Sequence, residues 1–415
     1  MRDGATAMSD PRVPDNPFDA PSGDLFADVP LLREIQRVLL SSDGPVNWEL
    51  ARQIGIASAQ WGQEDEPPTD EDARQVQEAV RLAELQIGQF TSLAPPTDVA
   101  SVRAVRRAEW VQANIESLRD LLEPAAERVG EAITKAQQEA ASSLDSDVHA
   151  TAEPGIAGMA AQLQQAMGQL SPLLLGAQVG QVLGYLGQRV LGQYDIAVPR
   201  SGPGSMLFVI PNIAAFERNW SLPQTDFRTW VALHEVAHRF EFAQAWTHAH
   251  FRMLLDDFLS TLEFDVGGIQ ERLAGLDISD PEAMQRAMES EPGLFGTVLD
   301  AEQRIKLARI QAFMAAAEGY GDHLTRALGE RLLPSYGRIE EAMRRYRESE
   351  HADPVFERLL GIEMKRDHYR LGLAFCDTVV ELTDEATLSS MWSSPEALPS
   401  MPEIEEPRLW LARSA

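Results

Sequence analysis

The segment Val231–Phe242, VALHEVAHRFEF, constrains the fold of this chain more than any other part of the sequence. It contains two histidines four positions apart, His234 and His238, which share one face of an α-helix and can then reach a single ion together. Phe227 and Trp230 extend an apolar stripe along the same helix, so we expect at least one of the two histidines to be buried. The segment therefore predicts an apolar helix with a pair of histidines on one face.

The pattern His-Glu-x-x-His rarely arises by chance. With 8 histidines and 64 acidic residues among 415 positions, fewer than about 0.02 matches are expected in a shuffled chain. Glu235 follows His234 directly and points around the helix from it, where its carboxylate could take a proton from water at a metal ion. We predict that His234 and His238 bind zinc and that Glu235 is the catalytic base. The alternative is a pair of hydrogen-bonded histidines in the core.

A third protein ligand is needed, because a catalytic zinc site has three of them and leaves a fourth position for water. The run AFMAAAEGYGDHL places Glu318 among small and apolar residues, which is a poor environment for an unpaired charge. We predict that Glu318 is the third ligand and that Gly319 leaves space beside it. Asp322 follows one turn later on the same face, and we predict that it accepts a hydrogen bond from the non-ligating nitrogen of one histidine.

The chain offers other candidates for the third ligand besides Glu318. One class of zinc enzymes has a histidine six residues after the second ligand with a glycine between, but this chain has Glu241 and Gln244 at those two positions. That class is therefore excluded. His248 and His250 would need a sharp turn after the motif helix, and Glu263 lacks an aspartate four residues later; these three remain alternatives.

Charge and cysteine content narrow the classes of partner and compartment. The chain carries 36 basic and 64 acidic residues, and its net charge of -28 argues against binding to nucleic acid or to anionic membranes, which repel a polyanion. Cys376 is the one cysteine, so no disulfide can form within the chain, and the cytoplasm is the expected location. The N-terminus has no basic start followed by an apolar run, so no signal peptide is expected.

The best candidate for a membrane span begins at Leu170, but glutamines and an arginine interrupt it, so we expect no span there. Within it, Gly176, Gly180 and Gly184 recur every four residues. On a helix they form a smooth ridge, which predicts close packing against a neighbouring helix.

The pattern along the chain predicts a mainly α protein (α+β) with one small sheet. We expect residues 1–27 to be a disordered segment, 28–150 a helical N-terminal region, and 151–415 the catalytic region with a helical C-terminal part. QYDIAVP and SMLFVIPN surround the turn-rich RSGPG and predict a β-hairpin. The motif helix follows this hairpin and is expected to begin with Thr225 or Asp226 as its N-cap.

Seven sequence blocks, in order along the chain, carry a family resemblance. They are GPVNWELARQ, RVLGQYDIAVP, LFVIPNIAAFERNW, WVALHEVAHRFEF, AEGYGDHL, LLGIEMKRDHYRLGLAF and EIEEPRLWLAR. From about Asn16 onward the chain resembles the zincin-like, zinc-dependent metalloproteases of actinobacteria and related bacteria. Some members have a genomic association with deazaflavin-coenzyme biosynthesis. The resemblance implies a zincin-like fold with His234, Glu235 and His238 in the motif and Glu318 downstream.

These observations predict a zinc-dependent hydrolase of the metallopeptidase type, with a peptide or amide as substrate. Two alternatives are a non-catalytic interaction protein stabilised by metal and a small-molecule amidohydrolase linked to coenzyme metabolism. Glu235 weighs against the first, because a purely structural site needs no base. Tyr320, His323 and Tyr336 are candidate oxyanion donors, although packing explains each of them as well. Substrate identity and oligomeric state do not follow from the sequence.

Overall fold

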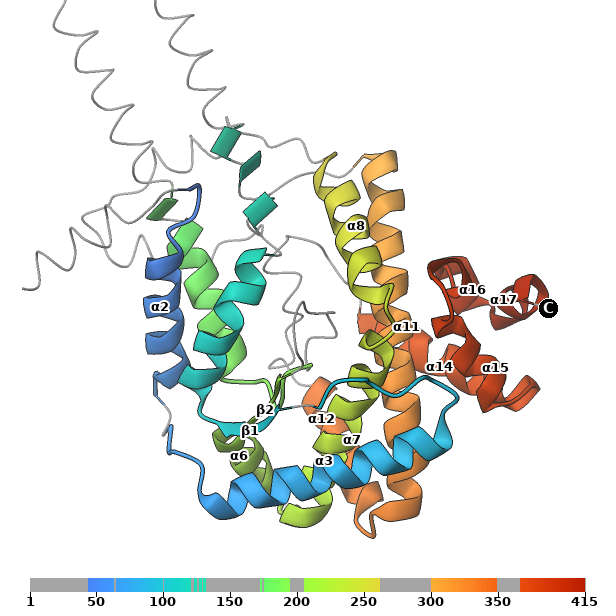
Figure 1. Ribbon diagram of the computed structural model, residues 1–415, viewed down its shortest axis with the longest axis horizontal. Helices are drawn as coiled ribbons and strands as arrows, with labels where there is room; N and C mark the ends of the chain where they lie inside the picture. The colour runs from blue at the N-terminus through green and yellow to red at the C-terminus, as the bar shows by residue number, and fades with distance from the viewer. Residues whose placement is uncertain are drawn as a thin grey trace, which may run out of the picture. The chain divides into compact units, whose positions relative to one another are not determined.

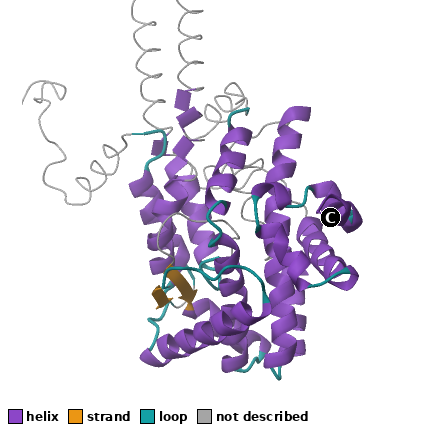
Figure 2. Cartoon of the chain, turned by 45° about the vertical axis from the view of Figure 1, so that its right-hand side comes forward, coloured by secondary structure: helices purple, strands orange, loops and turns teal. Residues whose placement is uncertain are grey.

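The computed structural model describes residues 44–62, 65–99, 101–120, 172–194 apart from 174, 205–261, 300–348 and 366–414, with short stretches between 123 and 131. All of them belong to the unit Ser42–Ala415. Within these residues the structure is mainly helical with a small two-stranded sheet, which confirms the predicted fold class (Figures 1 and 2).

Most of the described elements along the chain are helices. In chain order, the elements are α2 (Trp48–Gln60), α3 (Asp70–Phe90), β1 (Ser101–Val105), a helix over 107–120, a helix over 175–187, β2 (Ser205–Val209), α6 (Ile210–Trp220), α7 (Gln224–Phe242), α8 (Thr247–Leu259), α11 (Ala301–Leu332), α12 (Tyr336–Glu348), α14 (Arg366–Leu382) and the short α15 (Glu385–Ser389), α16 (Met401–Glu405) and α17 (Pro407–Ser414).

The sheet consists of β1 and β2, which run parallel with Ser101 opposite Ser205 and Val105 opposite Val209. β2 lies within the run SMLFVIPN, as predicted. β1 was not predicted, because the sequence around it was expected to be helical. It is a short, half-exposed strand whose conformation depends on its distant partner, and strand propensity is weak evidence in such a case.

The expected hairpin is described only in part, because residues 195–204, which include its turn, lie outside the described residues. Just before them, Gly192 forms an antiparallel bridge with Phe208. The N–H of Val209 also donates a hydrogen bond to the carbonyl of Leu191 at 2.9 Å. β2 therefore pairs with the segment around Leu191 and Gly192 as well as with β1.

α7 carries the motif and is buried along most of its length, including every residue of the stretch 227–241. α3 and α11 pack against it, and α11 packs in turn against α8 and α14 (Figure 1). Charged residues in such a helix need partners. Arg228 pairs with Glu217 at 2.9 Å, and Arg239 pairs with Glu84 at 2.7 Å.

The start of α7 differs from the predicted one. The helix begins at Gln224 with Pro223 as its N-cap, and no side chain caps it. The expectation of Thr225 or Asp226 as N-cap was wrong. Asp226 instead accepts hydrogen bonds from the N–H and hydroxyl of Ser335, at 3.0 and 2.6 Å, just before α12.

The glycine ridge packs against α2, which confirms the predicted close approach. A side chain at Gly180 would meet the carbonyl oxygen of Ala51, and one at Gly184 would meet the side chain of Ser58. Two helices can approach this closely because glycine has no Cβ. Among the described helices, none is long and apolar enough to cross a membrane.

Candidate metal centre

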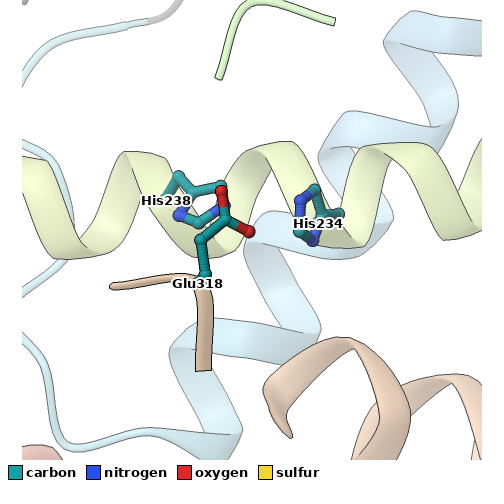
Figure 3. Close-up of side chains that lie close together, drawn as sticks. All are labelled: His234, His238 and Glu318. Atoms are coloured by element: carbon teal, nitrogen blue, oxygen red, sulfur yellow. The ribbon is translucent and has the colours of Figure 1, made fainter. Parts of the chain in front are cut away.

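Two helices supply the three side chains of the predicted metal site. α7 provides His234 and His238, and α11 provides Glu318, whose carboxylate points toward the two imidazole rings (Figure 3). One ligand atom from each residue lies within 4.8 Å of those of the other two. Within the described part of the chain, this is the one group of three or more such side chains placed to share an ion. The structure therefore brings together the residues that the sequence singled out.

Aromatic side chains one turn before and after the histidines lie against their rings. The ring of Trp230 stacks on His234 with 5.8 Å between centroids, and Phe242 stacks on His238 at the same distance. The two imidazoles meet edge to face, 4.7 Å apart. Both histidines are buried, which confirms and exceeds the prediction that at least one of them would be. This i, i+4 row restricts the rotamers of both imidazoles.

His238 has a defined hydrogen-bond partner on one side only. Its Nδ1 lies 3.0 Å from Oε2 of Glu241, while Nε2 is buried and makes no hydrogen bond with any described residue. A proton on Nδ1 that is donated to the carboxylate leaves the lone pair of Nε2 available. Nε2 is therefore the atom of His238 suited to a metal.

Asp322 lies beside the other histidine. Its Oδ1 is 3.9 Å from Nδ1 of His234, which is too long for a hydrogen bond. Arg347 of α12 holds the two carboxylate oxygens of Asp322 at 2.8 and 2.9 Å. The predicted hydrogen bond is not formed in this geometry, and the influence of Asp322 on metal binding stays a prediction.

Glu235 is buried next to a stretch of chain that precedes β2. Its Oε2 accepts a hydrogen bond from the backbone N–H of Tyr194 at 2.7 Å. Gly192 packs so closely on the carboxylate that a side chain there would collide with it. These contacts fix the orientation of Glu235, whose negative charge acts on the imidazole of His238.

The two histidines have opposite electrostatic environments. Burial lowers the pKa of His234 to about 3. Burial acts in the same direction on His238, but the negative charges of Glu241, Glu318 and Glu235 outweigh it and raise its pKa to about 9. The surroundings of His238 therefore stabilise a positive charge, which a divalent cation supplies as well as a proton does.

The glycines of α11 have roles other than the predicted one. We expected Gly319 to leave space beside Glu318, but a side chain at Gly319 would collide with the backbone of Gly372 on α14. The clearance at the site comes from Gly321, where a Cβ would lie 2.9 Å from Cε1 of His238. One glycine therefore lets α14 approach α11, and the other makes room for a histidine.

The alternative third ligands do not join this group. His250 packs against Trp246 and Phe313, and neither it nor His248 belongs to the triad. Glu263 lies outside the described residues.

The three candidate oxyanion donors have partners elsewhere. The hydroxyl of Tyr320 lies 2.6 Å from that of Thr91 and 2.9 Å from that of Ser389. His323 hydrogen-bonds two carboxylates, and the ring of Tyr336 packs against Gly329. These contacts agree with packing roles for all three.

Two residues that contact the site, Glu241 and Arg347, were not predicted from the sequence. Glu241 was noted only as a mismatch to another class of zinc enzymes, although its position three residues after His238 places it on the same face of the helix. That spacing could have identified it. Arg347 comes from a separate helix, and nothing in its local sequence indicates that it reaches Asp322.

The donor set fits zinc. Two imidazoles and one carboxylate form a usual set for a catalytic zinc site, which leaves room for water. Buried polar atoms in proteins are nearly always hydrogen-bonded. Nδ1 of His234 and Nε2 of His238 depart from this rule within the described structure. A cation held by Nε2 of His238 would satisfy that atom.

Comparison with known proteins points in the same direction. The sequence profile of a family described as zincin-like metallopeptidase matches residues 46–411. Curated protein sequences gave no match. Among solved structures, the chain is similar to a candidate hydrolase from Chloroflexus aurantiacus, which is described as having a novel fold. The two are 31% identical, with 89% of this chain and 98% of that chain covered and a TM-score of 0.59.

Proposed function

The chain belongs to the zincin-like metallopeptidase family, and on this premise we propose that it is a zinc-dependent hydrolase that cleaves peptide or amide bonds. The observation that carries the proposal is the group His234, His238 and Glu318, whose ligand atoms lie within 4.8 Å of one another. The similarity to a candidate hydrolase supports the same reaction class.

The roles of the residues follow from their positions. His234, His238 and Glu318 would hold the ion, and a bound zinc ion acidifies water and polarises the carbonyl under attack. Glu235 accepts a proton from the attacking water and passes it to the leaving amine. The hydrogen bond from Tyr194 holds the carboxylate of Glu235 in place for this transfer.

Metal content tests the proposal most directly. We expect the wild-type protein to bind about one zinc ion per chain, and alanine variants of His234, His238 and Glu318 each to lose most of it. Zinc per chain is measured by elemental analysis, and affinity by competition with a chelator. His248→Ala and Glu330→Ala are matched controls, since His248 lies just beyond α7 and Glu330 is exposed on α11. Full zinc in Glu318→Ala beside loss in both histidine variants would show that the third ligand is wrong.

A substrate screen then separates the reaction classes. The zinc-loaded protein is incubated with a peptide library and with a panel of small amides, including amides related to coenzyme intermediates. Cleavage of peptides supports a metallopeptidase. Cleavage of small amides alone would favour the amidohydrolase linked to coenzyme metabolism, and zinc binding without any hydrolysis would favour a non-catalytic interaction protein.

A further inference from the structure

We propose that Glu241 is a positioning residue that fixes His238 for metal binding; this inference rests on the proposed function. Glu241 does not belong to the group of three ligands. It acts on the metal through the far side of the imidazole.

The geometry defines this role. Oε2 of Glu241 lies 3.0 Å from Nδ1 of His238, and both side chains are fully buried. When Nδ1–H donates to the carboxylate, the tautomer is fixed and the lone pair lies on Nε2. Nε2 has no hydrogen-bond partner among the described residues. The carboxylate and the proposed metal therefore lie on opposite sides of one ring.

A purely structural role explains Glu241 poorly. Among the described residues, Glu241 forms an ion pair with His238 and with no arginine or lysine. The hydroxyl of nearby Tyr320 is directed to other side chains. A buried carboxylate with one imidazole as its partner costs stability unless that imidazole carries a positive charge or binds a cation.

Glu217 provides a contrast within the same fold. It is also buried and acidic, but it pairs with the guanidinium of Arg228 at 2.9 Å, which joins α6 to α7. That pair has a structural purpose without any ligand. The one hydrogen bond of Glu241 among the described residues is made within its own helix, to His238 three residues earlier. Its contact therefore joins no two helices and serves only to orient the imidazole.

The inference predicts a graded loss of zinc affinity, which a purely structural role of Glu241 would not produce. In Glu241→Gln the side-chain oxygen can still accept from Nδ1–H but the charge is lost, and we expect zinc affinity to fall about tenfold. In Glu241→Met the acceptor is lost as well, and we expect a fall closer to a hundredfold. The zinc-free forms of both variants should unfold at a lower temperature than the wild type, because each variant removes one partner of the buried pair between Glu241 and His238.

The experiment measures zinc affinity by chelator competition and thermal unfolding of the zinc-free protein for wild type and both variants. Glu217→Gln is the control, and we expect it to lower the unfolding temperature and leave zinc affinity unchanged. Wild-type zinc affinity in both Glu241 variants would overturn the inference alone, as would lowered stability with unchanged affinity. A wild-type protein that binds no zinc would overturn the proposed function itself.

Discussion

At the scale of single residues, a variant of Glu235 tests whether the protein is a hydrolase or only binds metal. We expect Glu235→Gln to keep its zinc and its fold, because glutamine has the same shape and can still accept the hydrogen bond from Tyr194. General-base catalysis contributes a factor of about a hundred to ten thousand. Turnover of any substrate found in the screen should therefore fall by at least that factor.

Steady-state kinetics and elemental analysis on the same sample check this prediction. Hydrolysis at the wild-type rate would mean that another group takes the proton. A variant with full zinc and unchanged biological activity would favour the non-catalytic alternative, which has no use for a base at this position.

At the scale of helices, the approach of α14 to α11 depends on two facing glycines. A Cβ at Gly319 would collide with the backbone of Gly372, and neither backbone can move without displacing its helix. We expect Gly319→Ala to lower the free energy of unfolding by about 1–3 kcal/mol, the usual cost of overpacking a tight interface. It should also weaken zinc binding, since Glu318 is the neighbouring residue on α11.

Urea unfolding and zinc competition measure the two effects. Gly337→Ala is the matched control, because a Cβ at Gly337 in α12 has nothing within 4 Å. That change should leave stability unchanged or raise it by up to about 1 kcal/mol, since alanine is the better helix former. Equal stabilities of the two variants would show that α11 and α14 do not pack as described.

At the scale of the whole molecule, His323 couples the stability of the helical assembly to pH. It lies on α11, its Nδ1 is 2.9 Å from Asp377 on α14, and its Nε2 is 3.0 Å from Glu385 on α15. Burial opposes protonation, but the two carboxylates outweigh it and raise the pKa of His323 above its usual value of 6.5. Arg326, which also pairs with Asp377, is the other charged group at this junction.

The sign of the pH dependence follows from that shift. Because the pKa is higher in the folded state, the stabilisation from His323 is fully present below 6.5 and is lost as the pH rises through the folded-state pKa. We expect His323→Gln to destabilise the zinc-free protein most at about pH 6 and progressively less toward about pH 9. Urea unfolding of both proteins across this range measures the difference. A difference that does not change with pH would mean that His323 has the same pKa in the folded and unfolded states.

The sequence alone determined the local half of the site. An i, i+4 spacing places His234 and His238 on one face whenever the segment is helical, and the apolar residues around them fixed the helix and its burial. Glu241 follows the same rule at i, i+3 and was within reach of the same reasoning. These features depend on residues a turn apart, so periodicity is enough to find them.

Only the tertiary structure decided which residues pack against α7. Whether Glu318 lies near the two histidines depends on how α11 packs on α7. The space for His238 comes from Gly321 and not from Gly319, the glycine next to Glu318. The pairing of β1 with β2 and the ion pair between Arg347 and Asp322 likewise join segments far apart in the chain. Such contacts arise from the shapes of packed surfaces and the closure of long loops, and the order of neighbouring residues does not encode them.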